Sequence, residues 1–271
     1  MAEGLLAARG GAVADTTRAA LLEVDDVVVT FGGVRALDGV SLAFGARGIT
    51  GIVGPNGAGK STLFDVLAGA RTPQAGRVRW DGRDVTRAPL HRRAHEGLAR
   101  SFQIARELDS LTVMENLLLA SPGHPGDALW RVLFTPGKVR DAEAALRERA
   151  WALLTRVRLA PLADRLAGEL SGGQKKLLEL ARALMLSPRL VLLDEPAAGV
   201  APGLVEVLAE FILGLKAEGT AFVVVEHNMD FVASLCDRVC VLADGALLTT
   251  GTFDEVTADE RVMRAYLGQV A

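Results

Sequence analysis

The stretch "GITGIVGPNGAGKST", residues 48–62, limits what this chain can fold into more than any other part of the sequence. Residues 48–54 are nearly all apolar, which is typical of a strand buried on both faces. The residues that follow match the pattern G-x-x-x-x-G-K-[ST], and a helix is expected over 59–68. The fixed positions of that pattern are occupied by Gly54, Gly59, Lys60 and Ser61.

Glycines in this motif let the backbone curl, so that successive N–H groups converge on phosphate oxygens. Lys60 is expected to reach the terminal phosphates, and the Ser61 hydroxyl is expected to ligate Mg²⁺. An accidental glycine-rich turn is the alternative, but the flanking strand and helix favour binding of a nucleoside triphosphate. The expected contacts are Gly54, Pro55, Asn56, Gly57, Ala58, Gly59, Lys60, Ser61 and Thr62.

Two carboxylates end a second apolar run, "LVLLDEP" at residues 190–196. In parallel α/β folds, the ends of such strands lie where ligands bind. We expect Asp194 to hold Mg²⁺ through water and Glu195 to polarise or deprotonate the attacking water, although an acidic pair alone often caps a helix. His227 follows the apolar run "AFVVVEH" in the same way, and it is expected to contact the terminal phosphate unless it caps a helix.

The segment "ELSGGQKKLLELARALM", residues 169–185, predicts a helix that begins at a glycine-flanked N-terminus. Such an N-terminus attracts anions because its free N–H groups and the helix dipole point outward. The chain therefore has one complete phosphate-binding motif and one spare helix N-terminus, at Ser171, Gly172 and Gly173.

The order of the expected elements predicts an α/β fold with a parallel sheet, because apolar strands alternate with helices after residue 188. Two antiparallel pieces near the N-terminus and a mainly helical middle, residues 90–170, are expected as attached lobes. A Gly/Pro-rich loop or insertion interrupts that middle at 121–138. Strands are expected over 21–31, 37–44, 48–54, 189–195 and 221–227, hairpins over 76–86 and 237–251, and a helix over 202–217.

The net charge of −3 argues against a dedicated nucleic-acid binder. No apolar run is long enough to cross a bilayer, and residues 1–20 have the composition of a flexible leader, so a cytoplasmic protein is expected.

Cys236 and Cys240, one helical turn apart if that segment is helical, are interpreted as buried or inert thiols rather than metal ligands. A locally basic stretch is interpreted as a solvated face, with a docking surface as the alternative. It comprises Arg83, Arg87, Arg92, Arg93, Arg100 and Arg106.

Taken in this order, the motifs resemble those of the nucleotide-binding subunit of an ABC transporter, over residues 21–268. The segment "LSGGQ", residues 170–174, is identical to that family's signature sequence. The resemblance implies a P-loop NTPase fold of ABC type: a mixed or parallel sheet core, an antiparallel β subdomain and a helical subdomain at about 104–187. It also implies a single nucleotide-binding domain over 21–271.

The same resemblance implies site residues. Phe31 stands where the family stacks an aromatic ring on adenine, although an aromatic residue at a strand end is often core. Gln103, after "SF", is expected to contact Mg²⁺ or the lytic water together with Lys60, Glu195 and His227. Ser61, Gln103 and Asp194 are the expected Mg²⁺ contacts. In the family two cassettes dimerise head to tail, so the signature residues would face ATP held by a partner chain. Those residues are Leu170, Ser171, Gly172, Gly173 and Gln174.

Within the family, "VEHNMDFV" and the ending "RVMRAYLG" are similar to the ATPase subunits of branched-chain (hydrophobic) amino acid importers. This likeness implies a second ATPase subunit, two membrane permease subunits and, indirectly, a solute-binding protein. A lipopolysaccharide exporter ATPase and a soluble assembly ATPase are the alternatives, and co-purification with membrane subunits distinguishes a motor from a soluble scaffold. One residue departs from the family: Ala201 stands before Pro202, where an Asp or Asn is usual. We therefore expect weakened communication between the two ATP sites.

Overall fold

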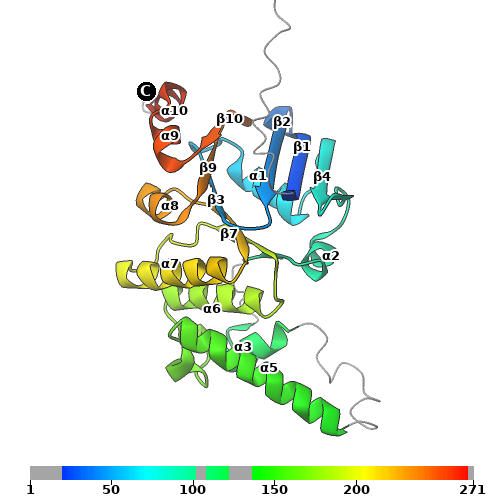
Figure 1. The fold of residues 1–271 in the computed structure, drawn as a ribbon, viewed down its shortest axis with the longest axis vertical. Helices are drawn as coiled ribbons and strands as arrows, with labels where there is room; N and C mark the ends of the chain where they lie inside the picture. The colour runs from blue at the N-terminus through cyan, green and yellow to red at the C-terminus, as the bar shows by residue number, and fades with distance from the viewer. Residues whose placement is uncertain (1–19, 102–107, 122–135, 268–271) are drawn as a thin grey trace, which may run out of the picture.

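A six-stranded sheet forms the centre of the molecule, with helices on both faces (Figure 1). The structure is a computed structural model, and it describes residues 20–101, 108–121 and 136–267. The strand order is β10-β9-β3-β8-β7-β6, in which β10 is antiparallel to β9 and the other neighbours are parallel. The strands are β3 (Ile49–Val53), β6 (Leu98–Arg100), β7 (Leu190–Asp194), β8 (Ala221–Val225), β9 (Arg238–Ala243) and β10 (Ala246–Gly251).

The central strands are apolar because both faces of the sheet are covered, and every residue of β8 is buried. Alternate residues of β7 enter two different cores. Leu190 and Leu192 pack with α1 (Lys60–Ala68), whereas Val191 and Leu193 pack with α6 (Gly172–Leu184) and α7 (Pro202–Ala217). Helix α1 and helix α6 therefore lie on opposite faces of the sheet. The parallel sheet that the alternation of apolar strands and helices predicted is confirmed.

A separate four-stranded antiparallel sheet, in the order β2-β1-β4-β5, covers α1. The expected strands near the N-terminus and the hairpin over 76–86 are confirmed. The turn after β1 uses two glycines with positive φ, Gly32 and Gly33. The strands are β1 (Ala20–Phe31), β2 (Val34–Gly45), β4 (Ala75–Trp80) and β5 (Arg83–Asp84).

The middle of the chain packs helices against α6 on the far side of the sheet from β1 and β2 (Figure 1). The described helices that do so are α3 (Val113–Leu119) and α5 (Pro136–Arg156), followed by short turns of 3₁₀ helix at Ala160–Leu162 and Ala167–Glu169. Helix α2 (Leu90–His95) instead packs beside β6 and the core that contains α1. The expectation of a mainly helical segment over 90–170 missed β6, which pairs with β7 at the sheet edge. A strand of three residues is too short to show a periodicity in the sequence.

The C-terminal part adds α8 (Met229–Leu235), the β9–β10 hairpin, α9 (Phe253–Thr257) and α10 (Glu260–Leu267). These elements share a third apolar core, which also contains Val53 at the end of β3.

Cys236 ends α8 and Cys240 lies in β9, so the two thiols are not one helical turn apart. Burial raises the pKa of both, that of Cys236 to about 12, which fits inert thiols. Within the described ranges, no helix combines the length and apolar character that a membrane span requires.

Candidate functional site

The loop between β3 and α1 has the backbone that its glycines predicted. Gly54, Gly57 and Gly59 all have positive φ. A Cβ at Gly59 would lie 2.4 Å from the carbonyl oxygen of Ala36, and a Cβ at Gly54 would lie 2.1 Å from that of Leu242. Gly59 is also the N-cap of α1 and supplies no side-chain cap, so the first turn of the helix presents its N–H groups to the loop. This geometry suits the binding of phosphate oxygens.

Lys60 is folded back onto this loop. Its side chain is buried, and its Nζ donates to the carbonyl oxygens of Gly54 at 2.7 Å and Pro55 at 2.8 Å. Burial lowers the pKa of Lys60, and the charge of Glu195 opposes that shift. A lysine already held across the mouth of the loop is placed to exchange these carbonyls for phosphate oxygens.

Asp194 and Glu195 lie at the carboxyl end of β7, as predicted. They line a cleft of about 890 Å³ together with Ser61. Hydroxyl and carboxylate oxygens are the ligands that Mg²⁺ prefers, so Ser61 and Asp194 fit that ion. Burial raises the pKa of Asp194, and the positive charge of Arg100 opposes the shift.

Arg100 is not part of a solvated face, contrary to the sequence interpretation. Its guanidinium donates to Asp65 Oδ1 at 2.7 Å and lies 3.6 Å from Asp194 Oδ2. It thereby connects α1 with the end of β7. The parallel pairing of β6 with β7, which the sequence did not reveal, brings Arg100 to this position.

His227 and Glu195 lie side by side, although they come from different loops. His227 Nε2 is 3.1 Å from Glu195 Oε1, and both side chains are nearly half exposed. The alternative that His227 caps α8 is wrong, because Asn228 is the N-cap and its side chain accepts the N–H of Phe231. A base and an imidazole in contact at the edge of the cleft can orient a water and pass a proton.

Glu226 is a site residue that sequence reasoning missed. Its carboxylate is only 2% exposed and accepts the N–H groups of Ala197, His227 and Asn228 at 2.7, 2.9 and 3.2 Å. It thus joins the loop after β7 to the loop after β8. The available signal was a charged residue directly after the fully apolar strand "AFVVV", since charged groups are buried only when they are well partnered.

The signature segment begins α6, but its N-terminus is not bare as expected. Ser171 Oγ accepts the N–H of Gln174 at 3.3 Å, and Gln174 Oε1 accepts the N–H of Ser171 at 2.9 Å. This capping box leaves the first helical residues, Gly172 and Gly173, on the anion-attracting end of the helix. Gly173 packs closely on Leu204 of α7, whereas Gly172 is exposed and has open space around it. Leu170 is buried in the core beneath.

The adenine candidate Phe31 lies at the exposed end of β1 and is 43% exposed, so it is not a core residue. The guanidinium of Arg71 lies 4.3 Å from the centre of its ring. An exposed aromatic face beside a cation suits stacking against a base. Gln103 and Arg106 lie outside the described residues. So do residues 1–19 of the expected leader and residues 122–135 of the expected insertion.

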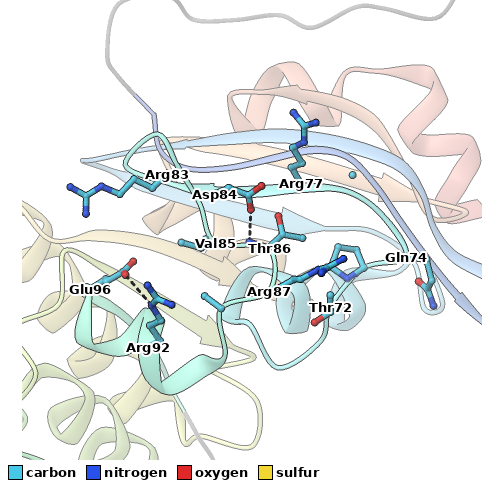
Figure 2. A pocket seen from close by; sticks show the side chains of 13 residues that line it. Thr72, Gln74, Arg77, Arg83, Asp84, Val85, Thr86, Arg87, Arg92 and Glu96 are labelled. Atoms are coloured by element: carbon cyan, nitrogen blue, oxygen red, sulfur yellow. Dashed lines mark hydrogen bonds and ion pairs between the residues drawn. The ribbon is translucent and has the colours of Figure 1, made fainter.

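The arginines of the basic stretch divide into exposed and buried groups. Figure 2 shows Arg83, Arg87 and Arg92 around a surface groove of about 700 Å³, with side chains that do not converge on one point. All three residues are exposed, as a solvated face requires, and the docking surface stays the alternative. Arg93 contradicts it, because its side chain is buried and donates to main-chain carbonyl oxygens, including those of Val66 and Leu67 in the last turn of α1. Burial lowers the pKa of Arg93 to about 10.

Comparison with known proteins places these features in a family. A model described as ABC transporter matches residues 37–198, and one described as branched-chain amino acid ATP-binding cassette transporter matches residues 246–271. The chain is 39% identical to a probable branched-chain amino acid transport ATP-binding protein LivG of Methanocaldococcus jannaschii, over 92% of this chain and 98% of that protein.

Two further similarities agree with the family matches. The chain is 38% identical to the high-affinity branched-chain amino acid transport ATP-binding protein BraF of Pseudomonas aeruginosa, over 92% of this chain and 98% of that protein. Among solved structures, the ADP conformation of an ATP-binding cassette of an ABC transporter superposes with a TM-score of 0.78. Its identity is 36%, over 92% of this chain and 99% of that one.

Proposed function

Because this chain belongs to the ABC transporter family, we propose that it is the ATP-hydrolysing motor of an importer for branched-chain or other hydrophobic amino acids. As an ATP-binding cassette of this family it is an ATPase. The names of its relatives support the solute class. The observation that carries the hydrolytic role is the cleft that Ser61, Asp194 and Glu195 line together. We also propose that residues 21–271 form one cassette, with the helical subdomain at about 104–187.

ATP is proposed to bind with its phosphates in the loop before α1, where residues 54–62 other than Pro55 carry backbone N–H groups, and with its adenine on Phe31. Lys60 then exchanges the carbonyl oxygens of Gly54 and Pro55 for the terminal phosphates. Ser61 and Asp194, with Gln103, would hold Mg²⁺, which neutralises charge that develops on the transferred phosphoryl group.

Glu195 is proposed to accept a proton from the attacking water. His227 contacts its carboxylate and is close enough to hold that carboxylate in one orientation. Its imidazole can also hydrogen-bond the terminal phosphate and respond to its loss. Glu226 keeps the two loops in register through its three backbone hydrogen bonds.

The signature segment is proposed to complete the site of a partner chain. Helix α6 and helix α1, which follows the phosphate loop, lie on opposite faces of the sheet, which supports donation to a partner rather than to the same chain. A second cassette, identical or different, would place residues 170–174 against the partner's triphosphate. A single chain would then lack part of the charge stabilisation, and losing one such donor elsewhere costs about 10²–10³-fold in rate.

The proposed partners are two membrane permease subunits, which hold the cassette at the inner face of the cell membrane, and indirectly a solute-binding protein. Nucleic acid is not a proposed partner. Opening and closing of the cassette dimer would be driven by ATP binding and hydrolysis, since a ligand shifts an equilibrium toward the state that it binds better.

Glu195→Gln tests this function. The complex is purified by affinity tag on this chain, and its subunits are identified. ATP turnover is expected to fall by about 10²–10⁴-fold, with ATP retained in a closed cassette dimer. Glu206→Gln is the matched control. Glu206 is an exposed carboxylate of α7 with no proposed role in the site, so this variant should keep normal turnover. Continued turnover of Glu195→Gln near the wild-type rate, or the absence of membrane subunits from the purified complex, would contradict the proposal.

A further inference from the structure

The side chain of Lys176 joins the signature helix to the loop that carries the general base. Its Nζ lies 2.6 Å from the carbonyl oxygen of Glu195 and 2.6 Å from that of Ala198. An ammonium group can donate three hydrogen bonds, and charged donors make stronger ones than neutral donors. Lys176 therefore fixes the loop after β7 at two carbonyls from a single point on α6.

The opposite side of the same loop is held from β8. Glu226 Oε1 accepts the N–H of Ala197 at 2.7 Å, and the N–H of Glu195 donates to the carbonyl oxygen of Val225 at 2.9 Å. The loop is thus clamped between a cation on α6 and a buried anion at the end of β8. If Lys176 or Glu226 is replaced, the loop loses the charged side chain that holds it on that side.

Glu195 depends on these supports because its backbone is strained. Its φ is +45°, a left-handed conformation that residues other than glycine adopt at a cost of about 1–3 kcal/mol. The hydrogen bond from Lys176 to the Glu195 carbonyl fixes the peptide group that follows this strained residue. The direction of the carboxylate, which contacts His227, therefore depends on Lys176.

Helix α6 can transmit a displacement from its N-terminus to this contact. Its first turn is closed by the capping box of Ser171 and Gln174, and the face that includes Leu177 and Leu178 is buried. Gly172 and Lys176 are separated by four residues, or about 6 Å along a helix axis. An element this short and well packed moves as a unit.

We propose that Lys176 is a positioning residue that couples the exposed N-terminus of α6 to Glu195 of the same chain. Contact of the signature segment with a partner's triphosphate would thereby align the general base for the chain's own ATP. This inference rests on the proposed head-to-tail dimer. It supplies a route between the two sites in a chain where Ala201 has no polar side chain for that task.

Lys176→Met in the purified transporter complex tests the coupling. We expect kcat for ATP to fall by about 10- to 100-fold, because small misplacements of catalytic groups cost rates of this order. The KM for ATP should stay within about twofold, since the hydrogen bonds of Lys176 go to the loop after β7 and not to the phosphate loop. The dependence of rate on ATP concentration should also lose cooperativity. Lys176→Arg, which keeps the charge and several donors, should restore most of the rate.

Lys175→Met is the matched control. Lys175 is the adjacent lysine on α6 and pairs with Asp109 at 3.1 Å instead of with the loop, so this variant should turn over ATP at the wild-type rate. Thermal unfolding and binding of a fluorescent ATP analogue to the isolated chain report whether Lys176→Met folds. If it does not, Lys176→Arg and Lys176→Gln decide the question, with Arg expected to be active and Gln slow.

The outcomes separate the two proposals. A wild-type complex that does not hydrolyse ATP overturns the proposed function and this inference with it. A wild-type complex that hydrolyses ATP while a folded Lys176→Met or Lys176→Gln variant matches its kcat overturns the coupling alone. An equal loss in the Lys175→Met control would also overturn it.

Discussion

Two glycine-rich helix starts differ in what requires their glycines. At Gly59, before α1, the chain itself excludes a side chain: φ is +95°, and a Cβ would lie 2.4 Å from a backbone oxygen of β2. At Gly172, the first residue of α6, a Cβ would meet nothing within 4 Å, and the backbone is helical. Alanine would be the better helix former there.

The difference teaches that the two phosphate-attracting sites are not equivalent. The loop before α1 is shaped by contacts within the molecule, so one chain contains all of it. Nothing within 4 Å in the described structure accounts for Gly172 being glycine, which favours a close approach by something outside the chain. This supports the proposal that the signature segment is half of a site.

Gly59→Ala has the broadest expected effect, because it should impair the isolated chain as well as the assembly. The new methyl group would force a strained backbone against Ala36 and Leu37, at an expected cost of at least about 1–3 kcal/mol. Since about 1.4 kcal/mol corresponds to a factor of ten, ATP binding by the isolated chain should weaken by about 5- to 140-fold if this cost opposes the bound form of the loop. Titration with a fluorescent ATP analogue measures this. Wild-type affinity for ATP in a folded Gly59→Ala variant would show that the loop before α1 does not require glycine at this position.

Gly172→Ala should leave the isolated chain intact and fail only in the assembly. ATP affinity and thermal stability of the isolated chain should not fall, whereas turnover of the complex should drop by about 10²–10³-fold if the methyl group displaces a phosphate. Gly203→Ala, at an exposed glycine with equally open surroundings in the first turn of α7, is the matched stability control. Full turnover in the Gly172→Ala complex would mean that the signature residues do not approach a partner's nucleotide.

The half-buried carboxyl group of Glu179, on α6, should make the stability of the protein depend on pH. Burial raises the pKa of Glu179 from 4.5 to about 7, against the opposing charges of Lys176 and Arg182 and a hydrogen bond from Ser101. The folded protein therefore holds this proton more tightly than the unfolded chain, and the resulting stability is lost as pH rises from about 4.5 through 7.

Glu179→Gln removes that titration. We expect it to be more stable than the wild type at pH 8 by about 1–3 kcal/mol, with a smaller difference at pH 5. Urea denaturation at both pH values measures the difference, and Glu210→Gln, an exposed carboxylate of α7, is the control. A pH-independent difference would show that the Glu179 carboxyl is not protonated in the folded state.

The smallest effect is expected at a third helix start. Ala201 is the N-cap of α7 and makes no side-chain cap, so Ala201→Asn should stabilise the chain by about 0.5–2 kcal/mol through a new hydrogen bond to the first turn. In the complex, the same variant should increase cooperativity between the ATP sites if Asn restores the missing link. A gain in melting temperature with unchanged cooperativity would assign the substitution a structural effect only.

Sequence reasoning predicted correctly the elements whose structure is specified by consecutive residues. The apolar strand, the glycines and Lys60 are consecutive, so their pattern predicted β3, the loop and α1 together, and the same holds for β7 with Asp194 and Glu195. The capping box of Ser171 and Gln174 was also within reach, since Ser-x-x-Gln before an apolar run is its sequence pattern.

Other features depend on residues far apart in the chain. Arg93 was interpreted as solvated with its exposed neighbours, yet it is buried against the end of α1, and Arg100 connects Asp65 with Asp194. Glu226 and Lys176 hold the same loop from two elements that are distant in sequence. No periodicity within a segment contains this information.

The sequence by itself determined which chemistry this chain carries, because strand, loop and helix around each phosphate-attracting segment are specified by adjacent residues. Only the tertiary structure decided how those segments are connected. Polar side chains such as Lys176 and Glu226 find their partners after the sheet and helices have packed, since a buried charge is stable only where distant backbone groups meet it.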